Sequence, residues 1–150
     1  MAVERERPYN QFNFLVDLGD GNTDGPKAGF QEVSGIGMEI TLAEYRNGNS
    51  LENSVMKVAG MNKSTDVTFK RGAMGSLNLY EWLDEIRNGS ASALRTLTVS
   101  LQNEDHSESV MTWKLQRCQI MKYTAPALNA KGTDVAVEEL VIATERMEME

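Results

Sequence analysis

Apolar residues recur at every second position along most of the chain, and this alternation restricts the possible folds more than any other feature. It is clearest at Phe12, Phe14, Val16 and Leu18. The same spacing returns in residues 65–71 and 96–101. Because residues two apart on a strand point to the same side of a sheet, each segment predicts a strand with one buried face. Residues 30–40 predict a further strand, in which Gly35 and Gly37 indicate a bulge or sharp bend.

Two later segments keep the alternation only in part. In residues 111–120 the apolar positions change parity after the third member: Met111, Trp113, Leu115, then Cys118 and Ile120. In residues 135–142 they change after the second: Val135, Val137, then Leu140 and Ile142. Such a change indicates a bulge, or a strand whose two halves bury opposite faces. Two changes fit a strongly bent sheet, or strands that a neighbouring subunit covers on one side.

One segment has helical periodicity. Its apolar residues are spaced by three, four and seven positions and form one stripe: Leu79, Trp82, Leu83 and Ile86. Ser76 or Asn78 can cap the start, and Asn78 with Glu81 resembles a capping box. Asn88-Gly89 predicts the end of the helix. We expect the stripe to pack on the strands rather than to dock a partner.

The strands and the helix together predict a mainly β fold. We expect a small antiparallel β-barrel or sandwich with one flanking α-helix, as a single domain over residues 1–150.

Residues 41–60 show neither the two-residue spacing of a strand nor the spacing of a helix. Six apolar or aromatic side chains nevertheless occur there: Leu42, Tyr45, Leu51, Val55, Met56 and Val58. Long loops in compact domains are commonly functional, and exposed apolar side chains mark contact surfaces. This segment therefore predicts a loop that meets a partner.

The composition excludes several function classes. The chain has 15 basic and 22 acidic residues, a net charge of −7, and its densest basic cluster is Lys70-Arg71. Phosphate binding needs clustered Lys and Arg, so we expect no specific nucleic-acid binding. We find neither a signal-peptide pattern nor an apolar run of about 20 residues, and we expect a chain folded in a cytoplasm without membrane insertion.

No residues form a recognisable catalytic or metal-binding constellation. Cys118 and His106 are the only cysteine and histidine, so an intramolecular disulfide, a cysteine-based zinc site and a multi-histidine centre are excluded. Residues 20–25 match the first half of a calcium loop, but position twelve is Gln31 instead of a bidentate glutamate. We expect a simple turn there, no cofactor, no metal, and no enzymatic activity.

Short segments along nearly the whole chain are similar to those of one known family. They are PYNQFNFLV (8–16), GFQEVSGI (29–36), EYRNG (44–48), VAGM (58–61), VTFKRG (67–72), LYEWL (79–83), PALNA (126–130) and VAVEEL (135–140). In order and spacing they resemble the tail tube proteins of contractile phage tails and extracellular contractile injection systems. The sequence departs from the family in a longer loop at 17–27 and in an acidic end, RMEME.

The resemblance implies a structural role. Six subunits would form a ring, and stacked rings would form a rigid hollow tube that a contracting sheath drives through a target envelope. The implied partners are further copies of the chain, the sheath protein, baseplate, spike and terminal cap proteins, and a tape-measure protein or cargo in the lumen. Assembly would take place in the bacterial cytoplasm, and the product would be a phage tail or an extracellular injection particle.

The resemblance also implies roles for particular residues. The long loop would reach a neighbouring subunit through Tyr45, Arg46, Leu51, Val55, Met56 and Val58. Neighbouring subunits would also cover strands with irregular alternation, as at Arg117 and at Glu138-Glu139. Candidate lumen residues lie on polar strand faces: Thr96, Thr98, Ser100, Asp66, Thr68 and Lys70.

Two other functions stay open at this point. A tube protein of a type VI secretion apparatus shares the fold, although its own opening and loop patterns are missing here. A monomeric β-barrel that binds a small ligand would need a preformed apolar cavity.

Overall fold

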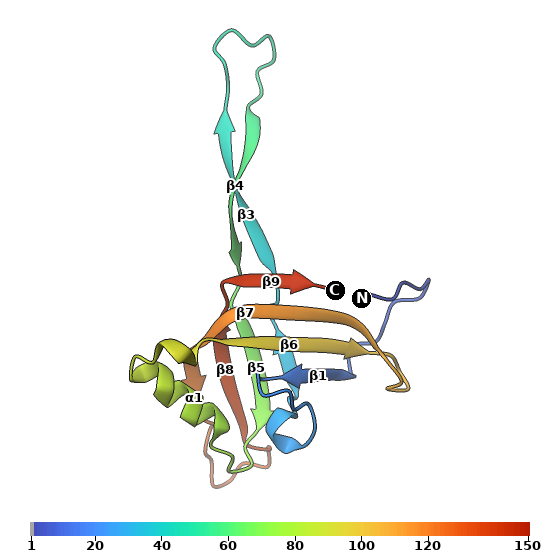
Figure 1. Cartoon of the computed structure of the whole chain (residues 1–150), viewed down its shortest axis with the longest axis vertical. Helices are drawn as coiled ribbons and strands as arrows, with labels where there is room; N and C mark the ends of the chain where they lie inside the picture. Colours follow the sequence, from blue (N-terminus) through green and yellow to red (C-terminus); the bar gives the residue numbers. More distant parts are fainter. Residues whose placement is uncertain (1) are drawn as a thin grey trace.

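The computed structural model describes residues 2–150 and is built mainly from strands (Figure 1). The strands are β1 (Phe14–Asp17), β2 (Glu32–Ser34), β3 (Met38–Tyr45), β4 (Met56–Ser64), β5 (Val67–Gly72), β6 (Arg95–Gln102), β7 (Ser109–Thr124), β8 (Val137–Ala143) and β9 (Arg146–Met149). One α-helix, α1 (Asn78–Arg87), and two short 3-10 helices, η1 (Pro26–Ala28) and η2 (Ala91–Ala93), complete the described chain. The predicted mainly β fold with one flanking helix is confirmed. None of the described helices is both long and apolar enough to cross a membrane.

Seven strands form one bent antiparallel sheet in two layers. The path runs β1-β6-β7-β8-β5-β2, and β9 pairs with β7 beside β8. The first half of β7 lies between β6 and β9, and its second half pairs with β8. Figure 1 shows β1, β6, β7 and β9 crossing β5 and β8, so β7 joins the two layers. The predicted bend is confirmed, but the sheet does not close into a barrel, because the path ends at β1 and β2.

A bulge in β7 explains the first change of parity. Leu115 pairs with Leu97 and Cys118 pairs with Arg95, so the intervening stretch of β7 holds one residue more than its partner. Arg117 takes a left-handed conformation with φ 51°. The extra residue turns Leu115 and Cys118 to the same side, and both are fully buried.

The second change of parity has a different cause. Val135 lies outside β8 and is exposed, whereas the buried residues of β8 are Glu138, Leu140 and Ile142. The buried residues of β8 are therefore spaced by two along the whole strand, and the first of them, Glu138, carries a carboxylate. The expectation that a neighbouring subunit covers Glu138 is wrong, because this chain buries the residue itself.

Helix α1 contributes to the core with part of its stripe. Leu79 and Trp82 are buried, and Leu83 and Ile86 pack on the core at partial exposure. The Trp82 indole donates a hydrogen bond to the carbonyl of Ala93 at 2.6 Å. The remaining core residues come from both sheet layers and the loops: Val16, Leu18, Val67, Phe69, Ala93, Leu97, Val99, Leu115, Cys118, Ile120, Leu140 and Ile142.

The caps of α1 match the expectation at one end only. Gly89 has φ 77°, and the backbone N–H groups of Asn88 and Gly89 donate to carbonyls of the last turn, as the sequence predicts. At the other end the cap position is Leu77, with no side-chain hydrogen bond to the helix. The predicted cap by Ser76 or Asn78 is wrong, because the side-chain oxygen Oδ1 of Asn78 accepts hydrogen bonds from Arg71 and Ser76 instead.

The largest departure from the sequence-based expectation lies in residues 30–60. The predicted strand 30–40 is split at Gly35, whose φ is 88° and where a Cβ would lie 2.6 Å from the Asp66 carbonyl oxygen. After this break, β3 pairs with β4 in a two-stranded sheet of its own, which projects from the body (Figure 1). Half of the predicted loop at 41–60 is therefore strand, in β3 and β4, and the other half, residues 46–55, is the irregular tip of a β-hairpin. We call residues 38–64 the arm.

Candidate functional site

The arm exposes both of its faces to solvent. Every residue of β3 is exposed, as is every residue of β4 before Ser64. Exposed large apolar and aromatic side chains are concentrated there: Met38, Ile40, Leu42, Tyr45, Leu51, Val55, Met56, Val58 and Met61. A two-stranded hairpin is marginally stable in water without a surface to pack on. The arm is therefore a strong candidate for contact with another molecule.

Strand pairing divides the arm into two apolar surfaces on opposite faces. Near the body, Met38, Ile40 and Leu42 follow one another on one face of β3; we call them the proximal face. Towards the tip, Ala43 pairs with Val58 and Tyr45 pairs with Met56, so these four side chains share the other face. We call these four residues the distal face.

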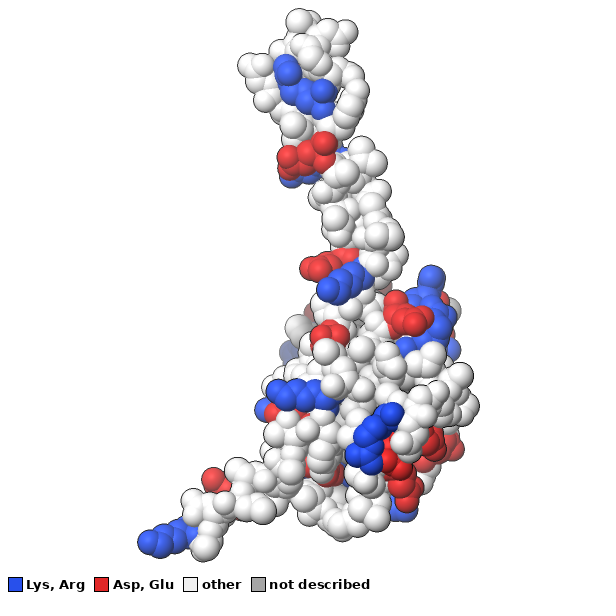
Figure 2. Space-filling view, turned by 90° about the vertical axis from the view of Figure 1, so that its left-hand side faces the viewer, with Lys and Arg blue, Asp and Glu red and all other residues white. Residues whose placement is uncertain are grey.

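Oppositely charged residues are cross-strand neighbours behind each apolar surface. Glu39 pairs with Lys63 behind the proximal face, and Glu44 pairs with Lys57 behind the distal face. Figure 2 shows charged side chains in small groups along the arm, separated by uncharged surface. If a partner covered each half of the arm on one side only, the covered face would be apolar and the face in water would be charged, as observed.

A bulge in β4 interrupts the pairing at the middle of the arm, whereas β3 keeps its alternation and its apolar residues change face after Leu42. The register shifts between the pairs Ile40–Asn62 and Leu42–Ala59. Gly60 lies at this shift, and a Cβ there would come within 2.9 Å of the Thr41 carbonyl oxygen. Only glycine allows the two backbones to approach so closely, so the bulge is encoded in the sequence.

The tip of the arm is organised by Arg46. Its guanidinium donates hydrogen bonds to the carbonyls of Ser50 and Glu52, each at 3.1 Å. The Tyr45 hydroxyl donates to the Asn47 side chain at 2.9 Å. Leu51 is fully exposed at the turn, and Val55 is exposed where the chain returns.

The structure thus places the six predicted contact residues in two groups. Tyr45, Met56 and Val58 lie together on the distal face, while Arg46, Leu51 and Val55 belong to the tip. Sequence reasoning missed the proximal face, although Met38, Ile40 and Leu42 keep a spacing of two. It also missed Met61, which lies next to the bulge and follows no period.

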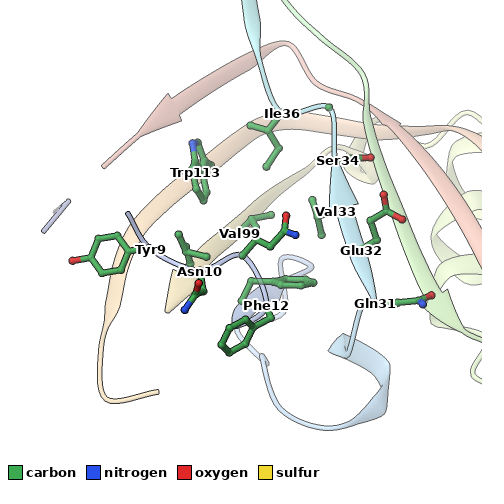
Figure 3. A pocket seen from close by; sticks show the side chains of 14 residues that line it. Tyr9, Asn10, Phe12, Gln31, Glu32, Val33, Ser34, Ile36, Val99 and Trp113 are labelled. Atoms are coloured by element: carbon green, nitrogen blue, oxygen red, sulfur yellow. The ribbon is translucent and has the colours of Figure 1, made fainter. Parts of the chain in front are cut away.

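A groove opens in the body below the base of the arm. Its volume is about 800 Å³, and Figure 3 shows it between the layer of β6 and β7 and the edge strand β2. Much of the lining is apolar or aromatic: Phe12, Phe14, Val33, Ile36, Val99, Leu101 and Trp113. Tyr9, Asn10 and Gln11 of the N-terminal segment and Gln31, Glu32, Ser34 and Gly35 complete it. No sequence pattern revealed this groove, because its residues come from distant segments.

An ion pair holds the N-terminal segment at the edge of this groove. The Arg5 guanidinium donates to both carboxylate oxygens of Glu104, at 2.5 and 3.0 Å, and lies 3.8 Å from the centre of the Tyr9 ring. The hydrogen bond from Arg5 lowers the pKa of the Glu104 carboxyl to about 2. Asn10 donates to the same carboxylate at 3.3 Å. The lining residues next to Tyr9 are therefore held by the turn between β6 and β7.

A buried ion pair links the neighbouring strands β5 and β8, and its arginine also reaches helix α1. Arg71 on β5 donates to Glu138 Oε1 on β8 through Nε at 2.8 Å and through the terminal nitrogen at 2.5 Å. Its other terminal nitrogen donates to the Lys27 carbonyl at 2.8 Å and to Asn78 at 3.0 Å. The Tyr123 hydroxyl donates to Glu138 Oε2 at 2.6 Å, and this hydrogen bond raises the pKa of Tyr123 to about 12.

The residues considered for calcium binding or catalysis make ordinary structural contacts. Asp20 and Asn22 accept hydrogen bonds from the backbone N–H groups two residues later, as in simple turns. His106 contacts the Gln102 side chain at 3.0 Å in the turn before β7, and burial raises the pKa of the Cys118 thiol. Within residues 2–150 no three His, Cys, Asp or Glu side chains are placed to hold a metal ion.

Comparisons with known proteins connect this arrangement to a family. The sequence matches the family described as T4-like virus tail tube protein gp19 over residues 10–148. No curated protein gives a match. The fold is similar to a chain of an extracellular contractile injection system, the PVC sheath–tube complex in its extended state. That likeness has a TM-score of 0.83 and 29% identity, and it covers 97% of this chain and 93% of the other.

Two further structures share the fold at lower identity. A chain from the anti-feeding prophage cap, the tube terminating cap, has a TM-score of 0.85 and 22% identity, covering 100% of this chain and 95% of the other. Hcp1 from Flavobacterium johnsoniae has a TM-score of 0.53 and 13% identity, covering 91% of this chain and 93% of the other. Because the family match spans nearly all of the sequence, this chain belongs to the T4-like virus tail tube protein gp19 family.

Proposed function

We propose that the chain is the repeating subunit of the rigid inner tube of a contractile particle, with six subunits in a ring and rings stacked into a conduit. The family match over residues 10–148 is the observation that carries this function. It implies a structural protein rather than an enzyme. The 29% identity with a chain of the PVC sheath–tube complex favours an extracellular injection particle.

The proposed partners follow from the same likenesses. A tube inside a sheath must contact the sheath protein, a baseplate at one end and a terminating cap at the other. The lumen would carry DNA or protein cargo, and the polar outer faces of β5 and β6 are candidates for its wall, through Thr68, Lys70, Thr96, Thr98 and Ser100. Asp66 lies just before β5 and is the remaining candidate.

The arm supplies a physical reason for assembly. Its proximal and distal faces are apolar, and a contact between unlike surfaces that repeats from copy to copy builds a ring or a filament. We assign Tyr45, Met56 and Val58 to contacts between subunits. Leu51, Val55 and the Arg46-organised tip belong to the same contact region.

The test compares two variants that alter opposite faces of the arm at the same height. The first replaces Tyr45, Met56 and Val58 with serine, and the control replaces Glu44 and Lys57 with serine. Native mass spectrometry and negative-stain microscopy should show rings or tubes for the wild type and the control, but not for the distal-face variant. Circular dichroism should give the same β signal for all three.

Two results would contradict the proposal. A wild-type chain that stays monomeric under all assembly conditions would favour the alternative of a monomeric ligand-binding module. Normal tubes from the distal-face variant would remove the arm from the interface while leaving the tube function in place.

A further inference from the structure

We propose that Asn47, in the exposed tip of the arm, is a site of spontaneous deamidation, at which the unassembled chain converts this side chain into a carboxylate. The nucleophile is the backbone nitrogen of Gly48, and water is the only other reactant. The modification is a property of the subunit by itself, whereas its effect on tubes rests on the proposed function.

The reaction conserves atoms and needs no oxidant. The Gly48 nitrogen gives up its proton and bonds to Cγ of Asn47, the Cγ–Nδ2 bond breaks, and the amide nitrogen leaves as ammonia. Water then opens the resulting five-membered imide at either of its two carbonyl carbons. Opening at Cγ leaves aspartate, and opening at the backbone carbonyl carbon leaves isoaspartate. In both cases one side-chain amide and one water become one carboxylate and one ammonium ion.

The Gly48 nitrogen is free to act as this nucleophile. Its N–H finds no hydrogen-bond acceptor among residues 2–150, and the turn is closed instead by the Ser50 N–H, which donates to the Asn47 carbonyl at 3.1 Å. Glycine has no side chain to obstruct ring closure, and the space around Gly48 is open. Because loop tips are more mobile than the strands they join, the nitrogen can approach Cγ without breaking the hairpin.

A hydrogen-bond donor prepares the Asn47 side chain for attack. The Tyr45 hydroxyl donates to Oδ1 of Asn47 at 2.9 Å. When the nitrogen attacks Cγ, negative charge develops on this oxygen, and a donor that is already in place stabilises the charge. The hydroxyl therefore lowers the barrier to ring closure.

The second Asn-Gly pair of the chain, Asn88-Gly89, is equally exposed but lies at the end of helix α1. There the Gly89 N–H donates to the Ile86 carbonyl and the Asn88 N–H donates to the Asp84 carbonyl, each at 3.0 Å. Ring closure would have to break the first of these hydrogen bonds and disrupt the end of the helix. This pair is therefore an internal control that matches the proposed site in sequence and exposure.

Deamidation changes the tip in charge and in backbone length. A carboxylate at position 47 adds a negative charge, and the isoaspartate form lengthens the backbone by one carbon atom within the turn. Tyr45, which contacts the reacting side chain, lies on the distal face that we assign to contacts between subunits. Converted subunits should therefore enter tubes less readily than unconverted ones.

Peptide mapping of the wild-type chain measures the conversion at both pairs in one digest. Trypsin cleaves after Arg46 and Arg87, so each pair begins a peptide of its own, residues 47–57 and residues 88–95. Dilute, unassembled chain is kept in mildly alkaline buffer, and mass spectrometry follows the mass gain that marks the change from amide to carboxylate. The first pair should convert about tenfold faster or more, because ring closure at the second must break a hydrogen bond and the helix end. Equal rates at the two pairs would overturn the proposal.

Two variants test the roles of the neighbouring residues. Gly48→Ala, which the open space tolerates, should slow the conversion of Asn47 about tenfold or more, equivalent to a barrier raised by about 1.4 kcal/mol. Tyr45→Phe should slow it about fivefold, the rate equivalent of one exposed hydrogen bond. Neither variant should alter the rate at Asn88. An unchanged rate in Gly48→Ala would overturn the proposal, and an unchanged rate in Tyr45→Phe would overturn the role of the hydroxyl.

Sedimentation links the modification to assembly. Partly converted subunits are brought to assembly conditions, tubes are separated from free subunits, and both fractions are mapped. The converted form of Asn47 should be depleted in the tubes, and equal amounts in the two fractions would overturn the effect on assembly. Absence of tubes from unconverted wild-type chain would instead contradict the proposed function, while the peptide map of the free subunit would still test the modification.

Discussion

Strands β8 and β3 are alike in sequence but differ in what covers them. β8 (VEELVIA) and β3 (MEITLAEY) each contain two carboxylates and several aliphatic residues. In β8 the residues Glu138, Leu140 and Ile142 are buried in the body, whereas Met38, Ile40 and Leu42 of β3 are about half exposed. Both segments form strands, but the partner that buries the apolar residues lies inside the chain in one case only.

This difference in burial separates the stability of the folded subunit from the stability of the assembly. Each fully buried aliphatic side chain of the body contributes roughly 1.5–3 kcal/mol to folding. Those of the arm contribute little until another molecule covers them. We therefore expect substitutions in the body to change the melting of the subunit, and substitutions in the arm to change assembly alone.

The largest effect on stability is expected at the buried ion pair. Arg71→Met leaves the Glu138 carboxylate buried without its cation, and breaking such a pair costs about 3–5 kcal/mol. Urea unfolding of subunits that carry the distal-face substitutions measures this without interference from assembly. The double variant Arg71→Met, Glu138→Leu should recover part of the loss, because no charge then remains buried. A single variant as stable as its parent would show that water reaches Glu138.

Substitution at a core position of β8 should give the second largest loss of stability. Leu140 is 1% exposed, and Leu140→Ala should lower the free energy of unfolding by about 2–5 kcal/mol through lost contacts and a cavity. The same urea titration measures it, with Val141→Ala on the outer face as the matched control. Equal losses from the two variants would mean that β8 is covered on both sides.

Substitution at the junction between body and arm should destabilise the subunit less than the two changes in the body. Gly35 has φ 88° and no space for a Cβ beside the Asp66 carbonyl, so Gly35→Ala should cost about 1–3 kcal/mol in strain. Gly48 lies in the tip with open space around it, and Gly48→Ala is the control. Differential scanning calorimetry should show a lower melting temperature for the first variant only. Identical melting curves would indicate that the chain bends elsewhere.

The sequence predicts the body well for a physical reason. One-sided burial produces alternation, and helix α1 shows its stripe because it packs on one side. The arm was mistaken for a loop because both of its faces are exposed and because the apolar residues of β3 change from one face to the other after Leu42. The groove and the partners of Glu138 depend on contacts between distant segments, for which a single sequence carries no local pattern.

The smallest effect on the isolated subunit is expected on the proximal face of the arm. Leu42 is 53% exposed, so Leu42→Ala leaves no cavity in the core, and its change in unfolding free energy should stay within about 0.5 kcal/mol. The same leucine-to-alanine change at Leu140 is the matched comparison, because only burial differs between the two sites. Urea titration of both variants, in the background of the distal-face substitutions, measures the contrast directly. A loss at Leu42 as large as that at Leu140 would mean that the subunit packs the arm against itself in solution, and the division between body and arm would then fail.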